Sequence, residues 1–184
     1  MGPITYSLCQ KPVIGFVMWA AYLCGFPPLI PNEPFPLTTA GVTVAKKFEA
    51  PVDKAYVFEL VFEFPSGAER LNDQLVGSWP LDYCGHNVRY EDIYKDIPES
   101  QRVKMGHPVP IRVVVRRLVD RSVVADQTHM TLCSSAFNST MKWRPIGWVT
   151  LSRGKYIAEV TNLESQPAFD GIKTMFTLIK GHGK

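Results

Sequence analysis

One segment of the chain constrains its fold more than any other, because its side chains alternate strictly between two types. Aromatic and aliphatic residues occupy every second position, at Tyr56, Phe58, Leu60, Phe62 and Phe64. Successive side chains of a β-strand point to opposite faces of its sheet, so such a segment buries one face. The carboxylates of Glu59 and Glu63, which lie between the aromatic positions, belong to the other face. The pattern predicts a strand that packs on an apolar core.

Six further strands are predicted, because runs rich in Val, Ile and Thr alternate with turn residues. They cover Val42 to Phe48, Ile111 to Val115, Val123 to Leu132, Ile146 to Leu151, Lys155 to Thr161 and Gly171 to Ile179. Seven strands with short turns predict an all-β fold, an immunoglobulin-like two-sheet sandwich.

Two local signals refine this fold. Ser66 and Glu69 form a capping box, which predicts one short helix from Ala68 to Val76 that Gly77 would end. Tyr156 opens a strand directly after a turn that contains Gly154, as in the tyrosine corner of β-sandwich domains. We therefore expect Tyr156 to be structural.

An uncharged run, Val13 to Phe26, precedes the predicted strands and follows the single Lys11. A membrane-spanning helix needs about 20 apolar residues and the core of a signal peptide roughly 7 to 15, so the length favours a signal peptide or an anchor. A buried core helix is the alternative. Cys24, followed by Gly25, is a candidate for lipid attachment, although Tyr22 and Leu23 are not the small residues that normally precede a lipidated cysteine.

A proline-rich segment connects this run to the strands. Proline fixes φ and donates no backbone hydrogen bond, so residues 27–37 are predicted to form either an extended linker or an ordered arm along the domain. The expected organisation is a signal or anchor over 1–26, the linker over 27–37, and one β-sandwich domain over 38–184.

Cysteine usage agrees with an exported protein. Cys84 and Cys133 are an even pair within the predicted domain. In an oxidising compartment they would form one disulfide, and the alternative is two buried thiols. We expect the protein in the periplasm or anchored to a membrane of the cell envelope.

A long polar segment without periodicity, Ser78 to Pro110, interrupts the strands, and such connections are often functional. Its aromatic, polar and Arg residues resemble the composition of interface hot spots. The candidate partner-binding residues are Trp79, Tyr83, His86, Asn87, Arg89, Tyr90 and Tyr94. The alternative is that this segment packs on the edge of its own sheet.

No pattern of a catalytic or metal site stands out. The chain has no Gly-x-Ser-x-Gly, no phosphate-binding Gly-rich loop and no His-Glu-x-x-His. Asp82, Cys84 and His86 are two residues apart and would lie on one face of an extended segment, but no second ligand pair with metal spacing accompanies them. We predict no enzymatic activity, no metal and no cofactor.

The charge distribution argues against nucleic-acid binding. The formal net charge is +3, and basic residues are interspersed with acidic ones. Arg112 and Arg116 would lie on one face of a strand and Arg117 and Arg121 on the other, which is not a continuous basic stripe.

Several motifs together resemble an uncharacterised proteobacterial family, domain of unknown function 5625. They are Arg144-Pro145-Ile146, Leu151-x-x-Gly154-x-Tyr156, Pro167-x-Phe169-x-Gly171-Ile172, Pro108-x-Pro110-Ile111-Arg112 and the Tyr56–Phe64 strand. The resemblance covers most of Thr38 to Lys184. It implies an exported, often lipid-anchored β-sandwich, and it implies for some members a role as immunity lipoproteins against secreted antibacterial toxins.

The leading hypothesis is therefore a binding protein of the envelope that neutralises a toxin by occluding it. A structural envelope module that binds glycan or lipid is the second hypothesis. A hydrolase that uses Asp82, Cys84 and His86 is the third.

Overall fold

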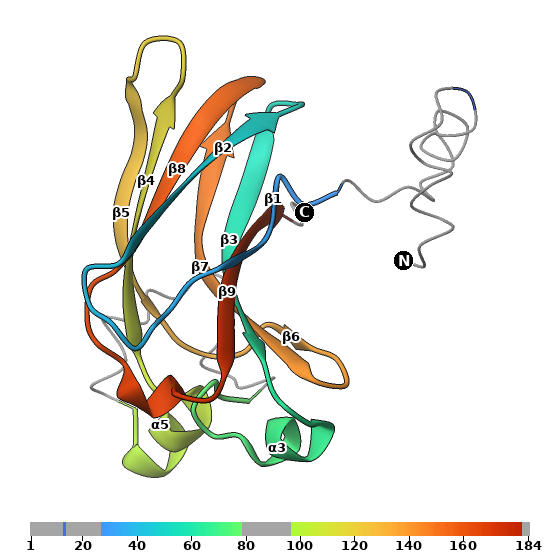
Figure 1. Ribbon diagram of the computed structural model, residues 1–184, viewed down its shortest axis with the longest axis vertical. Helices are drawn as coiled ribbons and strands as arrows, with labels where there is room; N and C mark the ends of the chain where they lie inside the picture. Colours follow the sequence, from blue (N-terminus) through green and yellow to red (C-terminus); the bar gives the residue numbers. More distant parts are fainter. Residues whose placement is uncertain (1–12, 14–26, 79–96, 182–184) are drawn as a thin grey trace.

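The computed structural model describes residue 13, residues 27–78 and residues 97–181, and these residues form two stacked antiparallel sheets (Figure 1). The five-stranded sheet has the order β1-β9-β3-β7-β6, and the four-stranded sheet has the order β2-β8-β4-β5. The predicted all-β, two-sheet sandwich is confirmed.

The strands of the five-stranded sheet are β1 (Ile30–Pro34), β9 (Lys173–Lys180), β3 (Lys54–Glu63), β7 (Met141–Leu151) and β6 (Ala136–Phe137). Those of the four-stranded sheet are β2 (Thr43–Ala50), β8 (Gly154–Asn162), β4 (Val109–Arg117) and β5 (Val123–Thr131). Three short helices complete the described residues, namely α3 (Gly67–Asn72), α5 (Glu99–Met105) and the 3-10 helix η1 (Pro167–Phe169).

The core lies between the sheets and contains the predicted face of β3. Phe58, Leu60 and Phe62 are at most 1% exposed. They pack with Val113 and Val115 of β4 and with other apolar side chains of both sheets. Val57 and Val61 point away from this core, yet they are buried as well. The strand alternation therefore predicts the core face correctly, whereas it understates burial on the other face.

Side-chain contacts bridge both long sides of the sandwich. On one side Lys46 of β2 lies 2.8 Å from the carboxylate of Glu33 of β1. On the other side the ring of His129, half-buried on β5, lies so close to Gly147 of β7 that a Cβ at Gly147 would overlap it. His129 is therefore directed between the sheets and does not lie on an outer surface.

Two strands were not predicted from the sequence pattern. β1 pairs with β9 although its segment is proline-rich, and Phe35 and Leu37, which follow it, are almost fully buried. Residues 30–37 thus lie along the domain as an ordered arm. The second strand, β6, has only two residues, too few for a periodic signal.

The predicted helix is shorter than expected. Ser66 caps α3 by accepting a hydrogen bond from the Glu69 N–H, as the capping box predicts. The helix ends at Asn72 because the carboxylate of Asp73 accepts from the N–H groups of Leu75 and Val76 and turns the chain away.

The two ends of the sandwich differ in construction (Figure 1). We call "lower end" the one that carries α3, α5, η1 and the turn 138–140, and "upper end" the one formed by the turns 51–53, 118–122 and 152–153. No helix among residues 13, 27–78 and 97–181 has the length and apolarity to cross a bilayer.

Candidate functional site at the lower end

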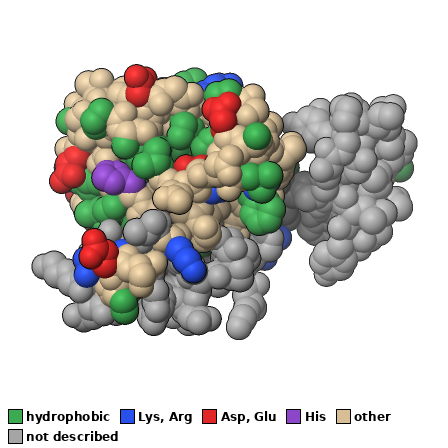
Figure 2. All heavy atoms as spheres, turned by 90° about the horizontal axis from the view of Figure 1, so that it is seen from below, with side chains coloured by type: hydrophobic (Ala, Val, Ile, Leu, Met, Phe, Trp, Pro, Cys, Tyr) green, Lys and Arg blue, Asp and Glu red, His purple; other side chains and the backbone are tan. Residues whose placement is uncertain are grey.

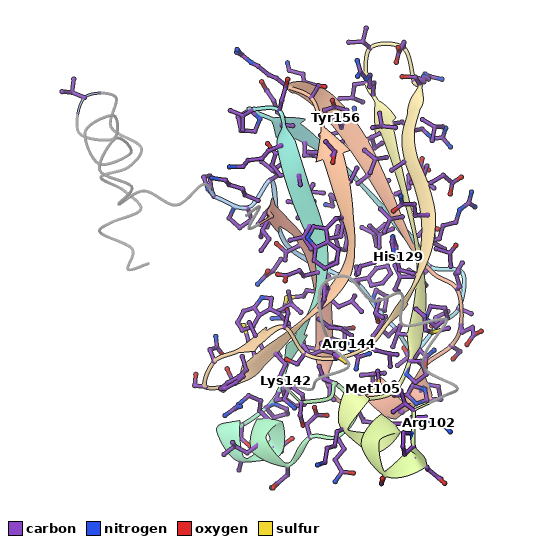
Figure 3. The ribbon with its side chains drawn as sticks, turned by 180° about the vertical axis from the view of Figure 1, so that it is seen from behind. Arg102, Met105, His129, Lys142, Arg144 and Tyr156 are labelled. Atoms are coloured by element: carbon purple, nitrogen blue, oxygen red, sulfur yellow. The ribbon has the colours of Figure 1, made fainter. Side chains whose placement is uncertain are left out.

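Two cations of β7 point into the lower end of the sandwich. Lys142 pairs with Phe62 and Arg144 with Leu60, so both occupy positions of the core-facing parity. Arg144 is 0% exposed and Lys142 is 7% exposed. In Figure 3 both side chains lie beside Met105 of α5, where the loops of the lower end close over the sheets. A cation on the core face must find acceptors, because burying it without them is costly.

Arg144 finds its acceptors in three different segments. One terminal nitrogen donates to the carbonyls of His107 (2.7 Å) and Thr131 (3.2 Å), and the other donates to the carbonyl of Leu75 (2.7 Å). The guanidinium also lies 5.5 Å from the centre of the Phe62 ring. Burial lowers the pKa of Arg144 to about 9, with the nearby Asp73 acting in the opposite direction, so the group is charged at neutral pH. Arg144 therefore ties the loops before and after residues 79–96 to the end of β5.

Lys142 forms a second buried tie. Its ammonium donates to the Asp73 carboxylate at 2.8 Å and to the Gly77 carbonyl at 3.1 Å. The Lys142 and Asp73 side chains are 8% and 4% exposed. Because the same carboxylate also accepts from backbone N–H groups at 75 and 76, its charge is well compensated.

The backbones of residues 75–78 and 104–107 lie directly against each other. The Ser78 N–H donates to Lys104 O, and the His107 N–H donates to Leu75 O. Gly77 and Gly106 both have positive φ, and a Cβ on either would meet the other segment's backbone within 2.7 Å. These two positions therefore require glycine, and no other residue would allow this approach.

This arrangement fixes the two chain ends that flank residues 79–96. Ser78 is bonded to Lys104 at the end of α5, and Ile97 is bonded through its carbonyl to the side chain of Arg102 in the same helix (2.7 Å). Figure 3 places Arg102 on α5 at the same end as Arg144. The frame made by residues 73–78, 97–107, Lys142 and Arg144 is hereafter called the lower-end frame.

An exposed patch lies beside this frame. The guanidinium of Arg70 stands 5.1 Å from the centre of the Phe137 ring, and Phe137 remains 57% exposed. Leu71, next to Arg70 on α3, is 72% exposed. Figure 2, which views the molecule from below, shows hydrophobic, acidic and basic side chains intermixed over the described part of this face. We call Arg70, Leu71 and Phe137 the lower-end patch.

The predicted partner-binding residues are Trp79, Tyr83, His86, Asn87, Arg89, Tyr90 and Tyr94, and all of them lie outside the described residues. The same holds for Asp82, for Cys84 and for the lipidation candidate Cys24. The structure thus describes the frame on either side of the predicted interface. The predictions on these side chains stay predictions.

Cys133 is the cysteine of the predicted disulfide that the structure describes. It is buried, has φ of 59°, and its N–H donates to Met105 O at 2.8 Å, so it lies at the lower-end frame. It is not a free thiol. Its pairing with Cys84 remains a prediction.

Sequence reasoning missed the residues that build the frame. Lys142 and Arg144 were outside the predicted strand because it was started at Ile146, after the charges. The signal that would have found them is the alternation of Lys142 and Arg144 with Trp143, which extends β7 toward its N-terminal end. Among the described residues no group of three His, Cys, Asp or Glu side chains is placed to hold a metal ion.

Comparisons with known proteins agree with this fold. The model of the family described as Domain of unknown function (DUF5625) matches residues 32–180. A crystal structure of a protein from Sulfurospirillum deleyianum is similar with a TM-score of 0.60 and 23% identity, covering 85% of this chain and 100% of that one. At that identity the similarity shows the fold alone. No curated protein matches the chain.

Proposed function

The chain belongs to the family Domain of unknown function (DUF5625), whose description gives no function. From the sequence and the geometry of the chain, we propose that it is an envelope-located binding protein that neutralises a secreted antibacterial toxin. The observation that carries the proposal is the lower-end frame, in which buried Arg144 bonds Leu75 and His107, one on each side of the aromatic segment 79–96. Binding residues on a connection held by a rigid scaffold lose little entropy on complex formation.

The lower-end patch supports the same proposal. Interface hot spots are rich in aromatic and Arg side chains that are accessible before binding. Arg70 and Phe137 form such a pair on the surface, with Leu71 adjacent. The toxin would contact this patch together with residues 79–96, and its active site would be covered. This mechanism needs no reacting group in the chain.

The proposed location rests on the N-terminal sequence. The uncharged run from Val13 to Phe26 would export or anchor the protein, with Cys24 as the candidate lipid attachment point. A disulfide between Cys84 and Cys133 would form after export and would tie the segment 79–96 to the lower-end frame.

A glycan-binding or lipid-binding envelope module is the second candidate. The observation that favours it is the exposure of Phe137 and Trp148, at 57% and 41%, on a β-sandwich surface. Aromatic rings of this kind offer flat apolar faces to a sugar. A pull-down with immobilised envelope glycans distinguishes this candidate from the toxin-binding protein.

The experiment that tests the proposal is a contact-dependent competition between the parent strain and a mutant that lacks this gene. We expect the parent to kill the mutant, and we expect the exported protein supplied in trans to protect it. Survival of the mutant, with the parental toxin systems shown to be active, would contradict the immunity function.

A further inference from the structure

The hairpin between β4 and β5 exposes apolar side chains at its tip. Val119 is 94% exposed, Val123 is 51% exposed and Leu118 is 36% exposed. In Figure 1 this hairpin projects beyond the other turns of the upper end. Val52, in the turn 51–53 of the same end, is 39% exposed. Four aliphatic side chains thus stand in solvent at one end of the domain.

Basic side chains surround this apolar tip. Arg116, Arg117 and Arg121 belong to the hairpin itself. The Leu118 N–H donates to Lys155 O at 3.0 Å, which holds the hairpin against the turn that carries Arg153 and Lys155. Arg121 has φ of 59°, a conformation in which Gly or Asn is the usual residue. The tip therefore keeps a long cation at a position where a small residue would fit better.

Three acidic residues near the tip are engaged in hydrogen bonds or ion pairs. Asp120 accepts from the Ser122 hydroxyl at 2.7 Å, and this bond is the main cause of its lowered pKa. Asp53 accepts from the Arg153 N–H, and Glu159 lies 3.8 Å from Arg116. Glu49 is exposed on β2.

The two ends of the sandwich differ in net charge. The upper end carries seven basic residues, which are Lys54, Arg116, Arg117, Arg121, Arg153, Lys155 and Lys180. Its four acidic residues are Glu49, Asp53, Asp120 and Glu159, so the formal excess is three positive charges. At the lower end the described residues include six basic and six acidic side chains, so their formal charges cancel. Lys54 and Lys180 adjoin each other, and this proximity lowers the pKa of Lys180.

The described chain joins the five-stranded sheet at β9, where Leu178 also pairs with Phe58 of β3. Leu29 donates from its N–H to Leu178 O, and Ile30 pairs with Leu178 near the upper end of β9.

We propose that the upper end of the sandwich docks on an anionic lipid surface, with the aliphatic tip of the β4–β5 hairpin entering the interfacial region and its basic neighbours contacting the lipid headgroups. This inference goes beyond the proposed function and does not depend on the toxin. Stable attachment to a membrane takes two signals, such as an inserted apolar group and a basic patch. A nucleic acid would match the charge, but it would leave the exposed aliphatic side chains in water. The proposed orientation would direct the lower end away from the membrane.

The test measures co-flotation of the full chain with vesicles of phosphatidylcholine alone and with vesicles that contain one third phosphatidylglycerol. The measured quantity is the ratio of anionic to zwitterionic binding, because the run from Val13 to Phe26 can bind both. A tip variant combines Leu118→Ser and Val119→Ser, and a charge variant combines Arg117→Gln and Arg121→Gln. The matched control changes one exposed aliphatic and one basic residue of the lower end, Leu71→Ser with Lys104→Gln.

We expect the ratio to fall at least fivefold in both upper-end variants and to change less than twofold in the control. In 0.5 M salt the ratio of anionic to zwitterionic binding should decrease for the native chain and for the tip variant. The ratio of the charge variant, which is already low, should change little with salt. Thermal unfolding followed by circular dichroism verifies that each variant is folded. An unchanged ratio in both upper-end variants would overturn the proposal. So would tight binding of a labelled DNA duplex to the native chain without preference for the anionic vesicles.

Discussion

The loops at the upper and lower ends of this sandwich are held in place by different kinds of hydrogen-bond donor. At the upper end the hydroxyls of two buried tyrosines, Tyr56 and Tyr156, donate to the carbonyls of Val52 and Ser152, each four residues earlier in the chain. At the lower end Arg144 and Lys142 donate to carbonyls of distant segments. A tyrosine hydroxyl has a single hydrogen to donate to one carbonyl, whereas a guanidinium or an ammonium has several and can bind more than one segment.

The hydrogen bonds at the two ends also differ in the sequence separation of their partners, which is short at the upper end and long at the lower end. Each tyrosine bond spans only four residues and therefore closes its own turn. The bond from Arg144 to Leu75 spans 69 residues and the one to His107 spans 37. Damage to the upper end should remain local, whereas damage to the lower end should release several segments together.

Replacing Arg144 should have the largest effect. Arg144→Met removes three hydrogen bonds that a charged donor makes to backbone carbonyls, although Leu75 O keeps the His107 N–H as a donor. We therefore expect the free energy of unfolding to fall by about 3–5 kcal/mol. The matched control is Arg112→Met, because Arg112 also donates two hydrogen bonds, but to Asp126 on an exposed surface. That change should cost about 0.2–1 kcal/mol. Chemical denaturation measures both, and equal losses would show that the lower end does not depend on its buried cation.

The predicted disulfide should have the second largest effect. A bond between Cys84 and Cys133 would close a loop of about 50 residues, and its loss should cost roughly 2–4 kcal/mol. Denaturation curves with and without reductant measure this cost, and Cys133→Ser should remove the difference between the curves. Labelling of both thiols in denaturant without reductant would contradict the bond.

The tyrosine hydroxyls should have the smallest effect. Tyr156→Phe removes the bond to Ser152 and keeps the ring, which stacks on Phe48 with ring centres 5.6 Å apart. We expect a loss of about 0.5–1.5 kcal/mol in chemical denaturation. Tyr56→Phe is the companion variant, and a similar loss is expected. If either tyrosine variant lost as much as Arg144→Met, the contrast between local and long-range closure would be wrong.

Much of the fold was accessible from the sequence, because the signals are local. The alternation from Tyr56 to Phe64 predicted β3 and its core face, and the turn before Tyr156 predicted a structural tyrosine, whose hydroxyl donates to Ser152 O. β1 was hidden because proline disfavours strands in general, although an edge strand tolerates it. The helix α5 was hidden because the Ser78–Pro110 segment showed no apolar period.

The lower-end frame was less accessible for a physical reason. The acceptors of Arg144 are backbone carbonyls, which every residue possesses, so no residue type marks Leu75, His107 or Thr131 as a partner. Only the fold brings them together. The need for glycine at positions 77 and 106 was hidden for the same reason, because the backbone that excludes a Cβ at each position is distant in the sequence.

The most direct test of the account is a competition assay with complemented mutants. A strain that lacks this gene receives the native full chain, a lower-end patch variant (Leu71→Ser with Phe137→Ser), or the upper-end variant Val52→Ser, all at equal protein levels. We predict that the native chain and Val52→Ser protect the strain from its parent, and that the patch variant loses at least tenfold of this protection. Full protection by the folded patch variant would contradict the claim that the lower end binds the toxin.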